Sequence, residues 1–331
     1  MTPARRSSSI TPIPRRSGTS PPAASNTPTE GALLVHPTEK GALVLYHQSL
    51  WSVMSVWFIT GASRGFGIKI ARQALRSGHN VVATARTTSH VIDVLGEGDR
   101  LLVLPLDITD ASQADAAVAA AVDRFGRIDV LVNNAGTGLL GAVEEASDAE
   151  TRTVFDVNVH GTLTVTRAVL PQLREQRSGT IITITSSGGF VSRAGWGVYC
   201  ATKFALEGIS EALKAELAPL GIGVVAIEPG GFRTDALDAS SLVAADTVID
   251  DYAHTAGHTR QVAADANHNQ PGDPAKAAKV IVDLEQVDPL PARIQLGQDC
   301  FDLVTAKLDT ARDEQATWRE VSISTAFDTA S

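Results

Sequence analysis

Two side chains four residues apart, Tyr199 and Lys203, could together perform acid–base chemistry. Residues at this spacing lie on the same face of a helix. A phenol has a pKa of about 10 and is a weak acid near neutral pH. An ammonium group one turn away favours the phenolate and lowers the pKa of the phenol, toward the pH at which general acid–base catalysis works best. The pair alone is weak evidence, because any amphipathic helix can contain it by chance.

A serine-rich turn and a glycine-rich loop precede this pair. Ser186 lies thirteen residues before Tyr199, and its hydroxyl could donate a hydrogen bond to an oxygen that gains negative charge during a reaction. Ser187 is the competing candidate for this role. The loop Gly61-Ala-Ser-Arg-Gly65-Phe-Gly67 stands between an apolar run and a helical pattern. Strand, glycine loop and helix are typical of a unit that binds the pyrophosphate of a dinucleotide at a helix N-terminus.

The end of the second predicted strand bears on the choice of cofactor. A carboxylate there would bind a ribose 2′-hydroxyl and repel a 2′-phosphate. This chain instead has Ala85 followed by Arg86, and Arg64 stands in the glycine loop. Two arginines without an acidic residue favour NADP(H) over NAD(H). The alternative is that both arginines are solvated surface residues.

Apolar runs and helical patterns alternate from Val56 onward. The predicted strands are 56–60, 80–85, 101–106, 128–132, 179–185, 223–228 and 293–296. The predicted helices are 68–77, 111–125, 148–177, 199–220, 275–286 and 300–318. This order predicts an α/β fold, with a doubly wound parallel sheet covered by helices on both faces. We expect a single domain with a variable C-terminal substrate segment.

The two ends of the chain differ in composition. Residues 1–53 begin with a stretch rich in Pro, Ser, Thr and Arg, so we expect a disordered N-terminal extension. The alternative is that translation starts at Met54. Residues 54–331 would then form the NADP-binding domain. Within it, the polar connection 235–274 is too long for a plain loop and is predicted to be a substrate lid.

Composition excludes several functional classes. The chain has 331 residues and a net charge of −9, which argues against nucleic-acid binding. Its two cysteines, Cys200 and Cys300, belong to no metal-ligand motif, so neither a metal site nor a disulfide framework is expected. The apolar stretch 42–59 is interrupted and too short for a membrane span. We therefore expect a cytoplasmic protein without nucleic-acid or membrane partners.

Taken together, these motifs resemble the short-chain dehydrogenase/reductase family over roughly residues 55–300. Thr60–Gly67 matches the cofactor loop of that family, Asn133–Gly136 its NNAG stretch, and Pro229-Gly230 its turn near the nicotinamide. The four catalytic positions of the family fall on Asn158, Ser186, Tyr199 and Lys203. The resemblance implies that Tyr199 exchanges a proton with the substrate and that Ser186 stabilises the substrate oxygen.

The resemblance also implies roles for the other positions. Lys203 would hold the ribose and lower the pKa of Tyr199, and Asn158 would extend a proton relay through a water. The alternative for Asn158 is a polar residue that only bends its helix. The implied cofactor-binding residues are Gly61, Ser63, Arg64, Gly65, Phe66, Gly67, Arg86, Asp107, Asn133, Ala135, Gly136, Tyr199, Lys203, Pro229, Gly230, Phe232 and Thr234.

The expected function is NADP(H)-dependent hydride transfer between nicotinamide and a small carbonyl or alcohol substrate, that is, oxidoreduction at a CH–OH group. Phe190, Val191, Trp196 and Phe232 suggest an apolar substrate. One alternative is a non-catalytic NADP-binding or redox-sensing protein, which would not need both Tyr199 and Lys203. An isomerase or epimerase would need a larger C-terminal domain. The family further implies a homodimer or homotetramer.

Overall fold

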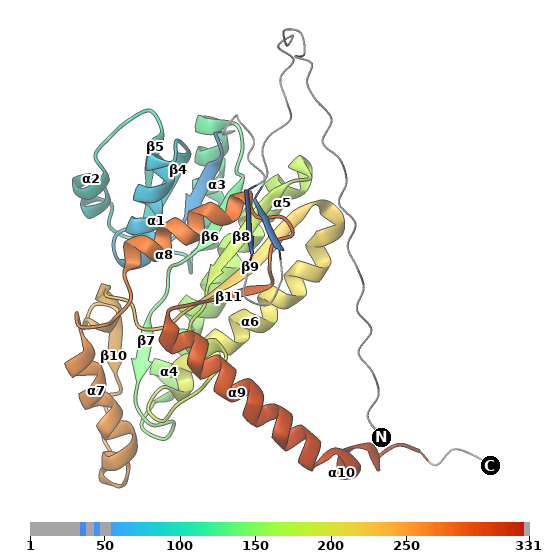
Figure 1. Ribbon diagram of the computed structural model, residues 1–331. Helices are drawn as coiled ribbons and strands as arrows, with labels where there is room; N and C mark the ends of the chain where they lie inside the picture. Colours follow the sequence, from blue (N-terminus) through green and yellow to red (C-terminus); the bar gives the residue numbers. More distant parts are fainter. Residues whose placement is uncertain (1–33, 38–42, 47–53, 328–331) are drawn as a thin grey trace, which may run out of the picture.

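The computed structural model describes residues 34–37, 43–46 and 54–327 (Figure 1). Within the first 53 residues these include two short strands, β1 (Leu34–Pro37) and β2 (Leu43–Tyr46), which pair antiparallel. The rest of the predicted N-terminal extension lies outside the described residues. Its disorder and the alternative start at Met54 therefore stay predictions.

Seven parallel strands form the central sheet, in the order β11-β9-β8-β6-β3-β4-β5. They are β3 (Val56–Ile59), β4 (Asn80–Ala85), β5 (Leu101–Pro105), β6 (Val130–Asn133), β8 (Gly179–Ile184), β9 (Ile222–Pro229) and β11 (Arg293–Leu296). The chain winds outward in one direction from β3 to β5 and in the other from β6 to β11. The predicted doubly wound parallel sheet is confirmed. Ligands of such folds bind where the strand order reverses, which here is the boundary between β3 and β6.

Helices cover both faces of the sheet (Figure 1). They are α1 (Gly65–Arg76), α2 (Ser89–Leu95), α3 (Ala111–Phe125), α4 (Asp148–Phe155), α5 (Thr162–Gln176), α6 (Gly197–Leu217), α7 (His258–Ala266), α8 (Pro274–Asp283), α9 (Gln298–Thr317) and α10 (Arg319–Ile323). The two apolar clusters of the core place α1 and α8 on one face, and α3 and α5 on the other. Most of α9 projects from the body, and residues 305–327 are all exposed.

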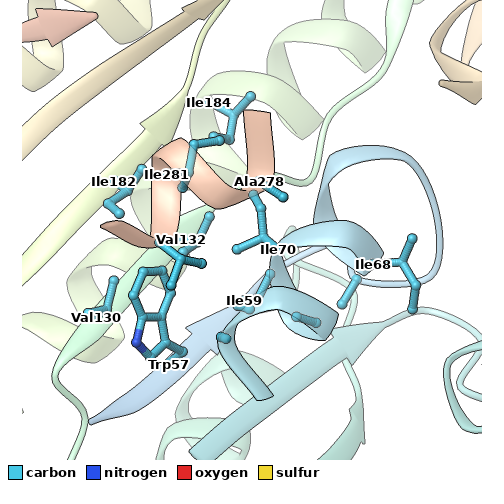
Figure 2. Packing of buried hydrophobic residues seen from close by; sticks show 14 of the residues in the cluster. Trp57, Ile59, Ile68, Ile70, Val130, Val132, Ile182, Ile184, Ala278 and Ile281 are labelled. Carbon is cyan, nitrogen blue, oxygen red and sulfur yellow. The ribbon is translucent and has the colours of Figure 1, made fainter. Parts of the chain in front are cut away.

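The alternation of side chains along β3 explains why its apolar run is continuous. Trp57 and Ile59 belong to one apolar cluster, and Val56 and Phe58 belong to the other. Successive side chains of a strand point to opposite faces, so a strand covered on both faces needs no polar positions. Figure 2 shows the first cluster, where Trp57 and Ile59 lie among side chains from α1, α8 and neighbouring strands.

The structure divides the helical pattern predicted for 148–177. A π-helical turn, η1 (Asp156–Gly161), separates α4 from α5. Such turns insert an extra residue into a helix and are frequent at functional sites. Asn158 lies in this turn and is fully buried. Two further strands, β7 (Gly138–Leu140) and β10 (Leu242–Ala244), pair with each other outside the central sheet and were not predicted.

Candidate active site

A cavity of about 970 Å³ opens at the carboxyl ends of the parallel strands. Its lining includes Gly61 after β3, Ala135 after β6, and Ser186 after β8. Tyr199 and Lys203 from α6 line the same cavity, so the acid–base pair and the glycine loop meet there. The other predicted residues that line it are Ser63, Arg64, Gly65, Phe66, Arg86, Asp107, Gly136, Pro229, Gly230, Phe232 and Thr234. Gly67, Asn133 and Asn158 are not part of the lining.

The loop before α1 depends on glycine at two places where another chain segment approaches closely. Gly61 has a φ of 64°, and an added Cβ would lie 2.8 Å from the Cα of Ala135. A Cβ on Gly67 would overlap the carbonyl oxygen of Gly61. The loop therefore exposes its backbone at the start of a twelve-residue helix. This is the geometry that a dinucleotide pyrophosphate requires, so the residues present fit such a cofactor.

Thr60 and Asn134 tie this loop to the loop after β6. The Thr60 hydroxyl oxygen accepts hydrogen bonds from the backbone N–H of Asn134 at 2.9 Å and of Ala135 at 3.1 Å. The Asn134 amide donates in return to the carbonyl oxygens of Thr60 at 2.8 Å and Gly61 at 3.0 Å. Asn134 also lines the cavity, although we had not singled it out within the NNAG motif.

Asn133, the preceding residue of that motif, has a different role in the structure. Its side chain is buried, and its amide donates to the Thr166 hydroxyl of α5 at 2.9 Å. This bond fixes β6 against the helix that covers it. The geometry therefore gives Asn133 a part in holding the wall of the cavity, and its predicted cofactor contact stays a prediction.

The two candidate serines occupy different places after β8. The hydroxyl oxygen of Ser186 accepts the Gly188 N–H at 3.0 Å and caps the short helix η2 (Ser187–Gly189). The Ser186 hydroxyl is also a hydrogen-bond neighbour of Tyr199. Ser187 lines the cavity as well, and its carbonyl oxygen accepts the backbone N–H of Val191 at 2.9 Å. The contact with Tyr199 favours Ser186 as the donor to a substrate oxygen.

Lys203 lies below the ring of Tyr199 on the same face of α6. Its Nζ is 5.8 Å from the centre of that ring and donates to the carbonyl oxygen of Ile184 at 3.0 Å. On the other side, the Trp196 ring meets the Tyr199 ring edge-on at 5.5 Å between centres. The Tyr199 ring therefore lies near both an aromatic ring and an ammonium group, and Tyr199 lines the cavity.

Burial controls the proton affinities of this pair. It raises the pKa of Tyr199 to about 12, and the hydrogen bond from Ser186 opposes the rise. Burial also lowers the pKa of Lys203 to about 8, against the opposing charge of Glu207. The expected lowering of the Tyr199 pKa by Lys203 is therefore wrong for this structure. Desolvation of the phenol is the largest cause of the shift, and Lys203 is not among the groups that oppose it.

The Asn158 amide makes hydrogen bonds to the backbone of Thr137 and to the side chain of Thr202. Its Nδ2 donates to the Thr137 carbonyl at 2.8 Å and to the Thr202 hydroxyl at 3.0 Å, and its Oδ1 accepts the Thr137 N–H at 2.8 Å. These bonds fix the segment after Gly136 against α6, next to Lys203. They agree with a positioning role, and the predicted water relay through Asn158 stays a prediction.

The region predicted as a lid forms one wall of the cavity. It contains η4 (Asp235–Leu237), β10, η5 (Asp250–Tyr252), η6 (Ala253–Gly257) and α7. His258, Val262 and Ala266, spaced four apart on α7, all line the cavity. Of the aromatic and apolar residues predicted there, Trp196 and Phe232 line it, whereas Phe190 and Val191 do not.

A buried carboxylate fastens this wall to the body of the protein. Glu145 is 1% exposed and accepts the backbone N–H of Ala142 at 2.7 Å and of Ile249 at 2.9 Å. It also pairs with Arg260 of α7. Glu145 thus joins the segment after β7 to two parts of the predicted lid. The sequence did not indicate these contacts, because Ile249 and Arg260 are each more than a hundred residues from Glu145.

Asp299, at the start of α9, was also not predicted and lines the cavity. Its carboxylate accepts the backbone N–H of Gly231 at 2.6 Å. A Cβ on Gly230 would overlap this carboxylate. The Pro229–Gly231 turn is thus held by a charged hydrogen bond from the C-terminal part of the chain.

A second cavity of about 370 Å³ adjoins the first beyond the end of β4. It is lined by Ser63, Arg64, Arg86, Thr87, His90 and Asp235. Arg64 also donates to the Ser240 carbonyl at 2.5 Å, which connects the glycine loop to the predicted lid. The two arginines singled out in the sequence are therefore brought together, with His90 as an additional polar group.

A scan against family models matches residues 55–242 to the short chain dehydrogenase family. This chain belongs to that family. This chain is 36% identical to the oxidoreductase BOA17 of Botryotinia fuckeliana, and the match covers 82% of this chain and 99% of the relative. Membership of this family leads us to expect a parallel sheet flanked by helices. The fold agrees with this expectation.

Solved structures resemble the same chain. A short-chain dehydrogenase from Streptomyces avermitilis is 42% identical, with a TM-score of 0.78, and the match covers 83% of this chain and 100% of that one. A 3-ketoacyl-(acyl-carrier-protein) reductase from Brucella melitensis, solved with NADH, is 27% identical with a TM-score of 0.62. That match covers 75% of this short-chain dehydrogenase and 98% of the reductase.

Two features are absent from the part of the chain that the structure describes. None of its helices combines the length and the apolar character needed to cross a bilayer. Nor do three or more His, Cys, Asp or Glu side chains gather there in a way that could hold a metal ion.

Proposed function

We propose that this short-chain dehydrogenase is an NADP(H)-dependent oxidoreductase that interconverts a carbonyl and an alcohol. The observation that carries the proposal is that Ser186, Tyr199 and Lys203 line the same cavity as the glycine loop. Both members of the acid–base pair are present at the cavity, with Lys203 buried and Tyr199 partly buried, which argues against a protein that only binds the cofactor.

The residues of the chain would act on the substrate oxygen. Ser186 donates a hydrogen bond to it, and this bond strengthens as negative charge develops. Tyr199 then transfers its hydroxyl proton to that oxygen, so that the carbonyl becomes a hydroxyl. Bound NADPH would supply the hydride that forms the new C–H bond. Lys203 lies near the phenolate that remains, until Tyr199 regains a proton from solvent.

The proton affinities favour the direction of reduction. A Tyr199 pKa of about 12 keeps the hydroxyl protonated at neutral pH. A protonated phenol is the form needed to give a proton to an alkoxide, and a phenolate is the form needed for alcohol oxidation. At neutral pH the free protein therefore holds Tyr199 in the form that carbonyl reduction requires.

The second cavity supports NADP(H) as the preferred cofactor. It brings Arg64 and Arg86 together at the end of β4, where a 2′-phosphate would lie. Guanidinium groups bind phosphate through charge-assisted hydrogen bonds. The carboxylate of Asp235 in the same cavity acts against an anion, and we expect the arginines to outweigh it.

The substrate would be mainly apolar. Val157, Trp196, Leu242 and Val262 line the cavity on the side of the predicted lid. We also propose a homodimer or homotetramer in the cytoplasm, as family resemblance implies. Light scattering on the purified protein tests the assembly.

A panel of apolar ketones and aldehydes, with the oxidation of NADPH followed by absorbance, tests the activity. We expect turnover by the wild-type protein and none by Tyr199→Phe, which keeps the ring and loses only the hydroxyl. NADPH binding, followed by fluorescence, should survive in the variant. Substantial turnover by Tyr199→Phe would exclude the proposed chemistry, and NADPH binding without turnover of any substrate would favour a non-catalytic protein.

A further inference from the structure

Two buried carboxyl groups lie beside Lys203 and take no part in the reaction described above. Glu207 follows Lys203 by one turn of α6, and Glu228 stands in β9 directly before Pro229. Their exposed fractions are 7% and 0%. Carboxylates are rarely buried to this extent without a partner, because removing their charge from water is costly. The pair therefore calls for a physical explanation.

Three side chains from β11 and α9 contact the pair. Arg293 of β11 places its Nε 3.6 Å from Glu207 Oε2 and 3.6 Å from Glu228 Oε1. Gln295, also from β11, donates to Glu228 Oε2 at 2.5 Å. From α9, the Cys300 thiol donates to the main-chain oxygen of Glu228 at 3.1 Å. Burial raises the pKa of this thiol to about 12, so it stays neutral.

The carboxyl groups around this pair outnumber the positively charged side chains that face them. Lys203 and Arg293 are the positive groups that face the pair, and the carboxyl groups are Glu207, Glu228 and Glu211. Glu211 is exposed and takes the Nη2 of Arg293 at 3.1 Å. Arg293 is therefore shared among three carboxyl groups. Two adjacent buried carboxylates cannot both ionise freely under these conditions.

Glu207 is the member of the pair that keeps a proton. Burial raises its pKa to about 7, and the charge of Glu228 adds to the rise, while Thr185 and Arg293 oppose it. Burial raises the pKa of Glu228 as well, but the bond from Gln295 and the charge of Arg293 favour its ionised form. Near neutral pH, Glu207 thus passes between its neutral and charged forms, and the contacts of Glu228 with Gln295 and Arg293 favour the negative charge on Glu228.

We propose that Glu207 is a positioning residue that sets how firmly Lys203 holds its proton, with Glu228 controlling the charge on Glu207. The geometric basis is the row of Tyr199, Lys203 and Glu207 on one face of α6, closed at its far end by Glu228 and Arg293. An ionised Glu207 stabilises the Lys203 ammonium, and a neutral Glu207 does not. The proposal rests on the function proposed above, in which Lys203 lies near the phenolate that Tyr199 leaves.

The proton of Lys203 can be followed directly by NMR in the full-length protein, with carbon-13 at lysine Cε and without cofactor. Lys203→Met assigns the signal. Glu207→Gln keeps the shape of the neutral carboxyl group and removes its charge, so the Lys203 pKa should fall by about one unit. Glu228→Gln tests the second part of the proposal: without the charge of Glu228, the pKa of Glu207 should fall, which carbon-13 at the glutamate carboxyl carbon measures. The Lys203 pKa should stay nearly unchanged in this variant, because Glu207 is then ionised throughout the range in which Lys203 titrates.

Glu211→Gln is the matched control, because Glu211 lies on the same face of α6 and touches Arg293 but is exposed. We expect no shift of the Lys203 pKa in this variant. An unchanged Lys203 pKa in Glu207→Gln, or an unchanged Glu207 pKa in Glu228→Gln, would overturn the proposal. If one variant fails to fold, the pKa shift measured in the other variant still tests the proposal. Because the titration uses no cofactor or substrate, its result is independent of the turnover assay that tests the proposed function.

Discussion

The carboxylate of Asp299 accepts the backbone N–H of Gly231 at 2.6 Å, and this bond joins the start of α9 to the turn after β9. The turn itself lines the cavity through Pro229 and Gly230. A residue near the C-terminus of the domain therefore determines the position of backbone at the centre of the candidate active site.

Asp299→Ala should loosen this turn and weaken NADPH binding by about tenfold, because a hydrogen bond to a charged group contributes about 1.5 to 3 kcal/mol. Fluorescence titration of NADPH measures the effect. Asp302→Ala removes an exposed carboxylate of the same helix that accepts a hydrogen bond from Gln298, and this variant should bind NADPH like the wild type. Equal affinities of both variants would show that the turn holds its position without Asp299.

Arg86→Ala should raise the Kd for NADPH much more than the Kd for NADH. The loss should be about tenfold or more, since a charge-assisted bond to the 2′-phosphate disappears. Arg86→Asp should reverse the preference toward NADH by adding repulsion. Arg76→Ala, at the far end of α1, is the control for the loss of a positive charge. Wild-type protein that binds NADH as tightly as NADPH would refute the assignment of this cavity.

Local signals allowed much of the fold to be predicted. The helix expected at 111–125 has these bounds in the structure, because both ends are marked in the sequence. The Asp110 side chain accepts hydrogen bonds from the backbone N–H groups of Ser112 and Gln113, and Gly126 takes a φ of 79° after the last turn. The strands β7 and β10 were missed because they are three residues long and depend on each other across the chain.

In the candidate active site, too, the sequence predicted residues within motifs but not contacts between distant parts of the chain. Motifs placed Gly61, Ser186 and Tyr199 in one site, and the structure brings them to one cavity. The contact between Asp299 and Gly231 joins residues 68 positions apart and leaves no pattern in the sequence. The Tyr199 pKa was predicted in the wrong direction, because a sequence shows that a lysine is near but not how far the surrounding residues desolvate the phenol.

The two adjacent serines should differ sharply in their effect on turnover. Ser186→Ala should lower kcat by a factor on the order of 10² to 10³, as the loss of one donor to a developing oxyanion does. Ser187→Ala should lower it far less, because Ser186 is the hydrogen-bond neighbour of Tyr199. Steady-state kinetics on one substrate compare the variants. A larger loss in Ser187→Ala would mean that the substrate oxygen lies on the other side of the turn.

Lys203 should make the stability of the protein depend on pH in a defined window. Burial lowers its pKa to about 8 in the folded protein, whereas an unfolded chain holds the lysine proton up to about pH 10.4. Between these values the unfolded state binds more protons, so the free energy of unfolding rises with pH. Below about pH 8 the cost of the buried charge is fully present, and above the unfolded pKa it is gone.

Urea unfolding of the wild type and Lys203→Met from pH 7 to 10.5 isolates this effect. Over the window the wild type should gain about 3 kcal/mol relative to the variant, because each pKa unit corresponds to 1.36 kcal/mol. The window for Tyr199 lies higher, between about 10 and 12, and it is common to both proteins. Lys279→Met removes an exposed lysine of α8 and should show no such gain relative to the wild type. A difference between wild type and Lys203→Met that stays constant across the window would mean that the buried lysine keeps its ordinary proton affinity in the folded protein.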